Sequence, residues 1–421
     1  MPAQRQLGFL SAVAVVIGSM LGSGVFTTSG FLLAELHTPG RVLAVWLAGG
    51  VMAMLGALCY GALARRFPES GGEYVYLSRT LHPAAGYLAG WVSLLVGFSA
   101  PLAAIALAFG EYSRLWFPLS SPPLTGSCLL AGSAVIHALH VERGAWVQNI
   151  GVLAKLLLAI VFLGLAFGRL HPPPPPQNLG GFSLFSFGSS LVLVAFSYSG
   201  WNTAAYIGSE VRAPERNLPR AMVLGTGIVT LLYLALNALF VYAAPVPQLA
   251  GKLEVGRLAA EALGGTALAN FVTALISLAL ATAVSTMIMA GPRVFARMAD
   301  DRCLPRCFQF PTQGPPRRAI WLQTALALVM LWTATFKGLL TYIGFTLSLC
   351  AAAAAAGLIR LRLREGPQLQ VPGWPWVPFL FVASVVLVTG LTIAHQPLES
   401  AVGLGTLSLG WLAWCLTRAK R

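Results

Sequence analysis

The chain has 421 residues, of which 57% are hydrophobic and only 10% charged, and its formal net charge is +14. Its mean hydropathy is +0.75, and it contains 44 glycines and 27 prolines, numbers that are high for soluble helices but usual for membrane helices. These values argue against two or three soluble domains and favour a single integral membrane domain over residues 1–421.

Twelve apolar segments follow one another along the chain, separated by short polar links. Each is about 20 residues long, enough to cross ~30 Å of hydrocarbon. We therefore expect an all-α integral membrane protein with about 12 transmembrane helices. The expected spans are residues 9–34, 41–64, 84–110, 124–141, 147–168, 185–208, 218–244, 268–294, 318–335, 338–360, 376–395 and 398–417.

The basic residues are distributed unevenly between the two sets of links. With both termini placed in the cytoplasm, 20 of the 27 Lys and Arg residues fall in cytoplasmic segments and 6 on the opposite side. This asymmetry is the positive-inside pattern, and it predicts cytoplasmic termini. A nucleic-acid surface would instead cluster its basic residues and interleave them with aromatic ones, so no nucleic-acid partner is expected.

The first span contains a weak point for a helix at residues 17–26, IGSMLGSGVF. Three glycines and two serines fall within seven positions, and each glycine costs roughly 1 kcal/mol relative to alanine in a helix interior. In a bilayer, backbone groups freed by a break must find a partner or line a cavity. A broken span is therefore a candidate binding site, where open N–H groups can hold an anion and open C=O groups a cation.

A second weak point interrupts the sixth span at residues 196–202, FSYSGWN. The two breaks lie five spans apart, so they correspond if spans 1–5 and 6–10 are inverted repeats, at about residues 9–168 and 185–360. Paired discontinuous helices in two repeats indicate a transporter site. The alternative is a pair of glycine kinks that serve helix packing, and Gly18 and Gly22 fit that explanation on their own.

Lys155 is the one strongly basic residue deep within a span, and all 13 acidic residues fall in links or at span ends. A lysine at mid-bilayer costs about 2.5–3.5 kcal/mol or more, which makes it a candidate functional residue. Without a carboxylate in any span, its expected partners are carbonyls of the broken first span and the hydroxyl of Ser285 or Thr286. The alternative is a side chain that snorkels to the interface.

The sequence gives no indication of a metal, a cofactor or an enzymatic site. The six cysteines form no disulfide framework. Cys303 with Cys307, and His137 with His140, are only weak metal signals. A membrane-embedded enzyme would need catalytic carboxylates, histidines or metal ligands inside its spans, so we expect neither catalysis nor a cofactor.

Several stretches together carry a family resemblance. They are residues 18–26 (GSMLGSGVF), 66–76 (RFPESGGEYVY), 196–202 (FSYSGWN), 214–220 (PERNLPR), 291–300 (GPRVFARMAD) and 371–375 (VPGWP). With these stretches in this order, the chain resembles a bacterial member of the amino acid–polyamine–organocation superfamily, close to the L-type amino acid transporter branch. The resemblance covers nearly the whole chain.

The resemblance implies a five-plus-five inverted repeat with discontinuous helices 1 and 6, two further helices at about 376–417, and alternating access. It implies that Lys155 occupies the place of a coupling sodium, in a coupling region that we extend to Gly18, Ser285 and Thr286. Phe196 would close over the substrate, and Asn202 would line the pocket. The substrate carboxylate would be held by Gly22, Ser23 and Gly24, and its ammonium by carbonyls of Met20, Phe196, Ser197 and Tyr198.

Two broken helices suit a zwitterion, because their ends offer one cation site and one anion site without an ionised side chain. We therefore expect a sodium-independent transporter of neutral amino acids in the bacterial inner membrane, working as an exchanger or a proton symporter. A carrier of cationic amino acids or polyamines, and a transport-like sensor or channel, remain alternatives. No obligatory partner subunit is expected. Cys128 lies near the start of span 4, roughly where the animal members of this family, called light chains, carry the cysteine associated with a heavy chain. We interpret Cys128 as an ordinary span residue.

Overall fold

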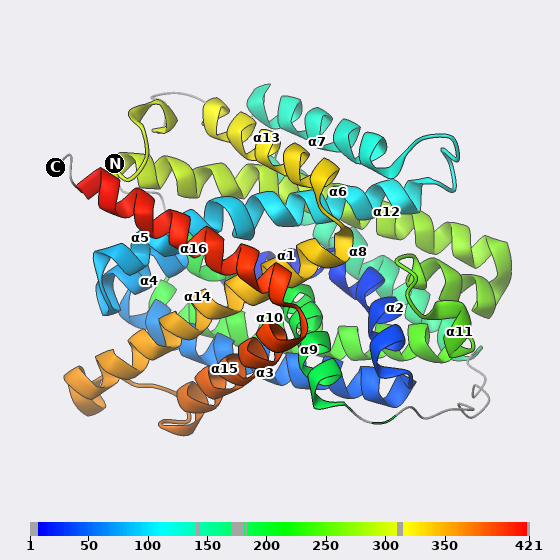
Figure 1. The fold of residues 1–421 in the computed structure, drawn as a ribbon, viewed down its shortest axis with the longest axis horizontal. Helices are drawn as coiled ribbons and strands as arrows, with labels where there is room; N and C mark the ends of the chain where they lie inside the picture. Colours follow the sequence, from blue (N-terminus) through cyan, green and yellow to red (C-terminus); the bar gives the residue numbers. More distant parts are fainter. Residues whose placement is uncertain (1–6, 140–143, 170–180, 182, 310–314, 419–421) are drawn as a thin grey trace.

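The computed structural model describes residues 7–139, 144–169, 181, 183–309 and 315–418. Within them the regular structure is helical throughout, apart from one isolated parallel bridge between Leu7 and Val211. The helices form a bundle in which most of them run along the long axis of the molecule (Figure 1). All six cysteines are free, while His140 of the weak metal signal lies outside the described residues.

The first five expected spans correspond to helices, two of them interrupted. Helices α1 and α2 form span 1, α3 span 2, and α5, the π-helical η1 and α6 form span 3. Helix α4 lies in the link before span 3, and α7 and α8 are spans 4 and 5. Their bounds are α1 Phe9–Met20, α2 Gly24–Leu36, α3 Pro39–Arg66, α4 Gly72–Thr80, α5 Pro83–Val92, η1 Ser93–Ser99, α6 Ala100–Ser113, α7 Pro122–Leu139 and α8 Gly144–Phe167.

The remaining seven spans follow in the same way. Helix α9 and the 3-10 helix η2 form span 6, α10 span 7 and α12 span 8, and α13 to α16 are spans 9 to 12. The short helices α11, η3 and η4 lie in links. The bounds are α9 Leu184–Tyr198, η2 Thr203–Glu210, α10 Pro214–Tyr242, α11 Val246–Leu249, α12 Val255–Asp300, η3 Arg306–Phe308, α13 Arg317–Thr333, α14 Phe336–Glu365, η4 Gly366–Gln368, α15 Trp376–His395 and α16 Pro397–Arg418.

Nine helical stretches among the described residues are long and apolar enough to span a membrane by themselves. Each of the twelve expected ranges nevertheless coincides with a helix, and α13, with 17 residues, is among the shortest. The expected all-helical membrane fold is confirmed. Two features were not expected from the sequence: helix α4 in the link after span 2, and the start of α12 at Val255, before the distorted pair Gly264 and Gly265.

Both predicted interruptions are present, at the centre of the bundle (Figure 1). Helix α1 ends at Met20 and α2 begins at Gly24, while α9 ends at Tyr198. Gly200 follows with a φ of +104°, in the region that favours glycine. A Cβ at Gly200 would lie 2.8 Å from the carbonyl carbon of Ser19, so the two interruptions pack against each other.

Candidate functional site

A cavity of about 1160 Å³ extends from the two interruptions to one end of the bundle. At its deep end it is lined by Gly18 and Ser19 of α1 and by Phe196 of α9. At its other end it reaches Glu69, in the link before α4, and Asp300, the last residue of α12. Its volume is slightly above the usual range for small-molecule sites, about 300–1,000 Å³, so it can admit a small solute and water.

The two broken helices touch without a gap where α2 begins and α9 ends. A Cβ built on Gly24 would lie 2.6 Å from the Cα of Ser197, closer than real Cβ atoms approach other atoms. The hydroxyls of Ser197 and Thr28 are 3.0 Å apart and hydrogen-bonded. Glycine is therefore required at position 24 by helix contact, whereas the sequence argument assigned Gly24 only to holding a substrate carboxylate.

The N-terminal end of α2 is equipped to receive an anion. The first N–H groups of a helix have no partner within the helix, and the helix dipole adds a partial positive charge there. Ser23, which precedes α2, is 1% exposed, and its hydroxyl has no hydrogen-bond partner within the described chain. Gly22 is partly accessible, with open space where a Cβ would project.

Tyr233 of α10 joins the two interruptions from the side. Its hydroxyl contacts the carbonyl of Met20 and lies 3.0 Å from the carbonyl of Ser197. The hydroxyl has one proton and donates it to one of these carbonyls at a time. Both carbonyls are groups that the sequence argument assigned to the substrate ammonium. The carbonyl of Met20 also accepts a hydrogen bond from the N–H of Gly22 (2.7 Å).

The other aromatic and polar residues expected at the second interruption have defined partners. Phe196 is 5% exposed and lines the cavity, and its carbonyl accepts a hydrogen bond from the N–H of Ser199 (2.9 Å). The Tyr198 hydroxyl donates to the carbonyl of Trp46 (3.1 Å), which makes this side chain a brace between α9 and α3. The Asn202 side chain lines the cavity and donates to Glu73 (3.1 Å).

Lys155 points into the protein from α8. Its side chain is 5% exposed, and its ammonium lies 3.5 Å from the carbonyl of Leu21, in the first interruption. This burial argues against snorkelling to the interface. The ammonium also lies just beyond the C-terminal end of α1, where the helix dipole favours a cation.

The two hydroxyls expected beside Lys155 have other partners. The Ser285 hydroxyl is hydrogen-bonded to Nε2 of His137 (2.7 Å), and that of Thr286 donates to the carbonyl of Thr282 (2.9 Å). Among the described hydrogen bonds, the structure thus brings Lys155 to the first interruption but not to Ser285 or Thr286. His137 of α7 was not expected in this region.

Sequence reasoning missed two residues that organise the site. Tyr233 lies in span 7, an apolar segment in which the polar side chains show no spacing that would have singled it out. Glu73 belongs to the GGEY stretch that carried the resemblance, yet it was counted only as a link residue. A buried glutamate that contacts the second interruption could be recognised only once α4 was known to turn back into the bundle.

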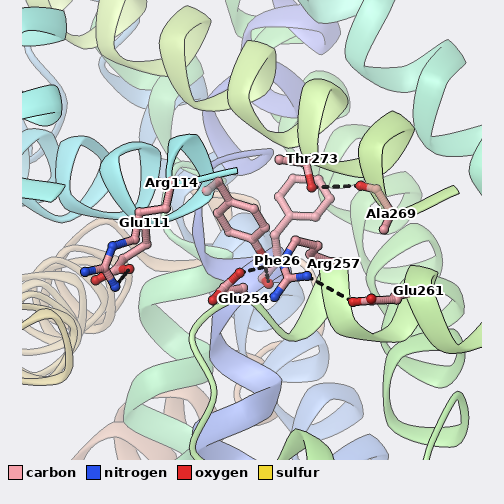
Figure 2. A network of polar contacts seen from close by, with 9 residues as sticks. Phe26, Glu111, Arg114, Glu254, Arg257, Glu261, Ala269 and Thr273 are labelled. Carbon is pink, nitrogen blue, oxygen red and sulfur yellow. Dashed lines mark hydrogen bonds and ion pairs between the residues drawn. The ribbon is translucent and has the colours of Figure 1, made fainter. Parts of the chain in front are cut away.

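The opposite end of the bundle is closed by a polar network between α2, α6 and the start of α12 (Figure 2). Arg257 bonds Glu254 (2.5 Å) and Glu261 (3.0 Å), and Tyr112 donates to the carbonyl of Phe26 (2.8 Å). Within the described chain, none of the residues labelled in Figure 2 lines the cavity.

The link between α10 and α12 is fixed to α2 nearby by a backbone hydrogen bond. The N–H of Gly251 donates to the carbonyl of Gly30 (2.7 Å). A Cβ at Gly30 would overlap the backbone of Lys252, so the link lies directly on α2. The cavity is therefore open at one end of the bundle and closed at the other.

A pair of interrupted helices beside a cavity that opens at one end of the bundle is typical of transporters. Comparison with known sequences identifies the transporter family. The family model described as amino acid permease matches residues 7–411. The chain belongs to this family. The permease is thus a transporter and not an enzyme, and the resemblance drawn from its motifs is confirmed.

Curated relatives match the permease over almost its full length. The serine/threonine exchanger SteT of Bacillus subtilis is 28% identical over 413 residues, covering 95% of this chain and 94% of its own. The b(0,+)-type amino acid transporter 1 of Mus musculus is 29% identical over 420 residues (94% and 83%). The large neutral amino acids transporter small subunit 2 of the same species is 27% identical over 428 residues (97% and 80%).

The contact between Gly24 and Ser197 leads to a paired test. Gly24→Ala should destabilise the permease by ~1–3 kcal/mol, because the added methyl group forces the two helices apart. Gly22→Ala is the matched control, since a Cβ there has only the Met20 carbonyl within 4 Å, at 3.9 Å. Melting temperatures of the two purified variants should show the difference. Equal stability of both variants would contradict the close packing of α2 on α9.

Proposed function

We propose that the permease carries neutral amino acids without sodium, by alternating access, as an exchanger or a proton symporter. The observation that carries this proposal is the first interruption: Gly18 and Ser19, near the C-terminal end of α1, line the cavity, and the buried Lys155 contacts the Leu21 carbonyl between α1 and α2. A zwitterion presents an ammonium and a carboxylate a few ångströms apart, and two opposed helix ends complement both.

In this proposal the substrate carboxylate binds at the start of α2, and Gly22, Ser23 and Gly24 supply the N–H groups. The N–H of Gly22 donates to the Met20 carbonyl in this structure (2.7 Å), so it must leave that partner to bind the substrate. The unpartnered hydroxyl of Ser23 supports this placement, since it can donate to a carboxylate. The substrate ammonium binds carbonyls at the ends of α1 and α9, those of Met20, Phe196, Ser197 and Tyr198. Tyr233 holds two of these carbonyls in place when no substrate is bound.

Lys155 takes the role of a fixed cation in the coupling region, together with Gly18, Ser285 and Thr286. Its contact with the Leu21 carbonyl supports this role, because an ammonium there satisfies a backbone group that a break leaves open. In this conformation the described hydrogen bonds of Ser285 and Thr286 are to His137 and to the Thr282 carbonyl, not to Lys155. Their part in coupling therefore requires a second conformation in which α12 has moved relative to α8.

Two inverted repeats, at about residues 9–168 and 185–360 and followed by two helices at about 376–417, would account for the arrangement. The broken α1–α2 pair matches the broken α9–η2 pair, and the next span of each repeat, α3 and α10, pack along each other. The positive-inside pattern supports cytoplasmic termini in a bacterial inner membrane. The open end of the cavity, with Glu69 and Asp300, would then face the cytoplasm.

A cationic substrate is the second candidate, and one observation favours it. Glu73 lines the cavity and could balance a positive side chain. Against this, its carboxylate already accepts hydrogen bonds from Tyr60 and Asn202. We also propose that the chain acts without a partner subunit. The relative SteT is named an exchanger without reference to a subunit, whereas the mouse large neutral amino acids transporter is named a small subunit.

Counterflow in proteoliposomes tests the function directly. Purified permease should give saturable counterflow of labelled serine, threonine or larger neutral amino acids, and much less of arginine or spermidine. Replacement of external sodium by choline should leave the rate unchanged, because Lys155 provides the fixed cation. Counterflow of arginine alone would favour the second candidate, its complete absence would favour a sensor, and steep sodium dependence would overturn the role of Lys155.

Lys155→Met should reduce counterflow by at least ~100-fold while the protein remains monodisperse, because the Leu21 carbonyl loses its partner and the break loses its fixed charge. Lys252→Met is the control, since Lys252 is exposed in the link before α12. It should transport like the wild type. Full transport by the Lys155 variant would show that the buried ammonium has no part in the cycle.

Phe196→Ala should separate binding from turnover. The ring lines the cavity beside the second interruption, and a closed ring there would exclude water above a bound substrate. We expect the variant to bind a labelled amino acid within ~3-fold of wild-type affinity but to exchange it at least ~10-fold more slowly. A scintillation proximity assay measures the first quantity and liposome uptake the second. Loss of binding with an unchanged maximal rate would contradict a lid function.

A further inference from the structure

Glu73 is a carboxyl group enclosed by the protein outside the membrane-spanning helices. It lies in the first turn of α4 and is 2% exposed. Two neutral groups donate to its Oε1 atom: the hydroxyl of Tyr60 in α3 (2.7 Å) and the side-chain amide of Asn202 (3.1 Å). Glu73 thus connects α4 to the interrupted part of span 6 through a single side chain.

The titratable groups that face Glu73 are themselves uncharged acids. They come from each element packed around it: Tyr60 in α3, Tyr76 in α4, Tyr206 in η2 and Cys350 in α14.

Two basic side chains on these elements have other partners. Arg79 of α4 pairs with Glu69 (3.5 Å), and Arg360 of α14 donates to the carbonyl of Leu81 (3.2 Å). Within the described chain, no ion pair includes Glu73.

This environment favours the protonated carboxyl group. Burial raises the pKa of Glu73 from 4.5 to about 7, although the hydrogen bonds from Tyr60 and Asn202 lower it in part. Because Glu73 also lines the open cavity, water can deliver and remove the proton.

Protonation changes the strength of the contact with Asn202. An ionised carboxylate accepts a charge-assisted hydrogen bond, which is roughly twice as strong as one between neutral groups. The neutral carboxyl group therefore holds the segment after Gly200 less firmly to α4. Gly200, at the start of that segment, packs on Ser19, so release of the segment affects both interruptions.

We propose that Glu73 is a proton-binding site that sets how firmly the interrupted part of span 6 is held to α4, so that a proton from the open cavity speeds the conformational exchange of the permease. The inference rests on the proposed transport function. The proton binds reversibly to a carboxylate oxygen and returns to water, and no other reactant is involved. Above the pKa the ionised form holds the segment, and below it the neutral form releases it.

The transport experiment compares counterflow between about pH 5.5 and about pH 8.5 in wild type, Glu73→Gln and Glu215→Gln, a range on both sides of the raised pKa. The wild-type rate should fall at least ~3-fold as the pH rises through about 7. Glu73→Gln should keep the fast rate at every pH. Glu215→Gln, which changes an exposed carboxylate in the first turn of α10, should follow the wild type.

Tyr60→Phe gives a second test that keeps the carboxyl group. Without the hydroxyl the ionised form loses a donor, so the midpoint of the pH profile should move to higher pH while its amplitude stays. An unshifted midpoint, a wild-type rate that does not vary with pH, or a folded Glu73→Gln protein that is inactive at every pH would each overturn the proposal.

Thermal stability reports the proton site even if no amino acid is transported. The folded protein binds this proton more tightly than the unfolded chain, so the stability contributed by Glu73 is complete below the usual carboxyl pKa and is lost as the pH rises through about 7. The melting temperature of Glu73→Gln minus that of wild type should therefore increase across this range. A difference that stays constant with pH would show that Glu73 binds no proton there. A changing difference without counterflow would count only against the transport function.

Discussion

The contact between the beginning of α2 and the end of α9 is the constraint on which the rest of this molecule depends. Two helices that stop in the middle of a bundle leave N–H and C=O groups in surroundings where an unsatisfied polar group costs several kcal/mol. The protein meets this cost by placing the interruptions against each other, at Gly24 and Ser197 and again at Gly200 and Ser19. The surrounding helices then supply the missing partners.

Those partners come from elements that are distant in the sequence. Tyr233 of α10 reaches a carbonyl of each interruption, Lys155 of α8 reaches the first, and Glu73 of α4 holds the segment that follows the second. Each does so with a single polar group at the end of a buried side chain. The site is consequently rigid through packing but adjustable through a few hydrogen bonds, and this combination suits a protein that must alternate between two arrangements.

The sequence was sufficient for features that depend on local composition. Clusters of glycine and serine predicted both interruptions, because they weaken a helix wherever it lies, and the isolated Lys155 was conspicuous because a charge inside a span is rare. The partners of these groups depend on how helices pack, which periodicity does not encode. The hydroxyl of Ser285 or Thr286 was expected beside Lys155, but that of Ser285 is hydrogen-bonded to His137. Glu73 was assigned to a link because nothing local indicates that α4 folds into the bundle.

The closed end of the bundle is built on a different principle from the open end. There the link before α12 is held to α2 by main-chain atoms, from Gly251 to Gly30. Backbone amides do not titrate, and their hydrogen bonds are only weakly affected by salt, so this attachment is insensitive to the composition of the medium. It is also indifferent to most side-chain changes in the link, but not to any enlargement at Gly30, where a Cβ would overlap the backbone of Lys252. Substitutions should therefore be tolerated at most positions of the link but not at Gly30, and only with strain at Gly251, whose φ is +74°.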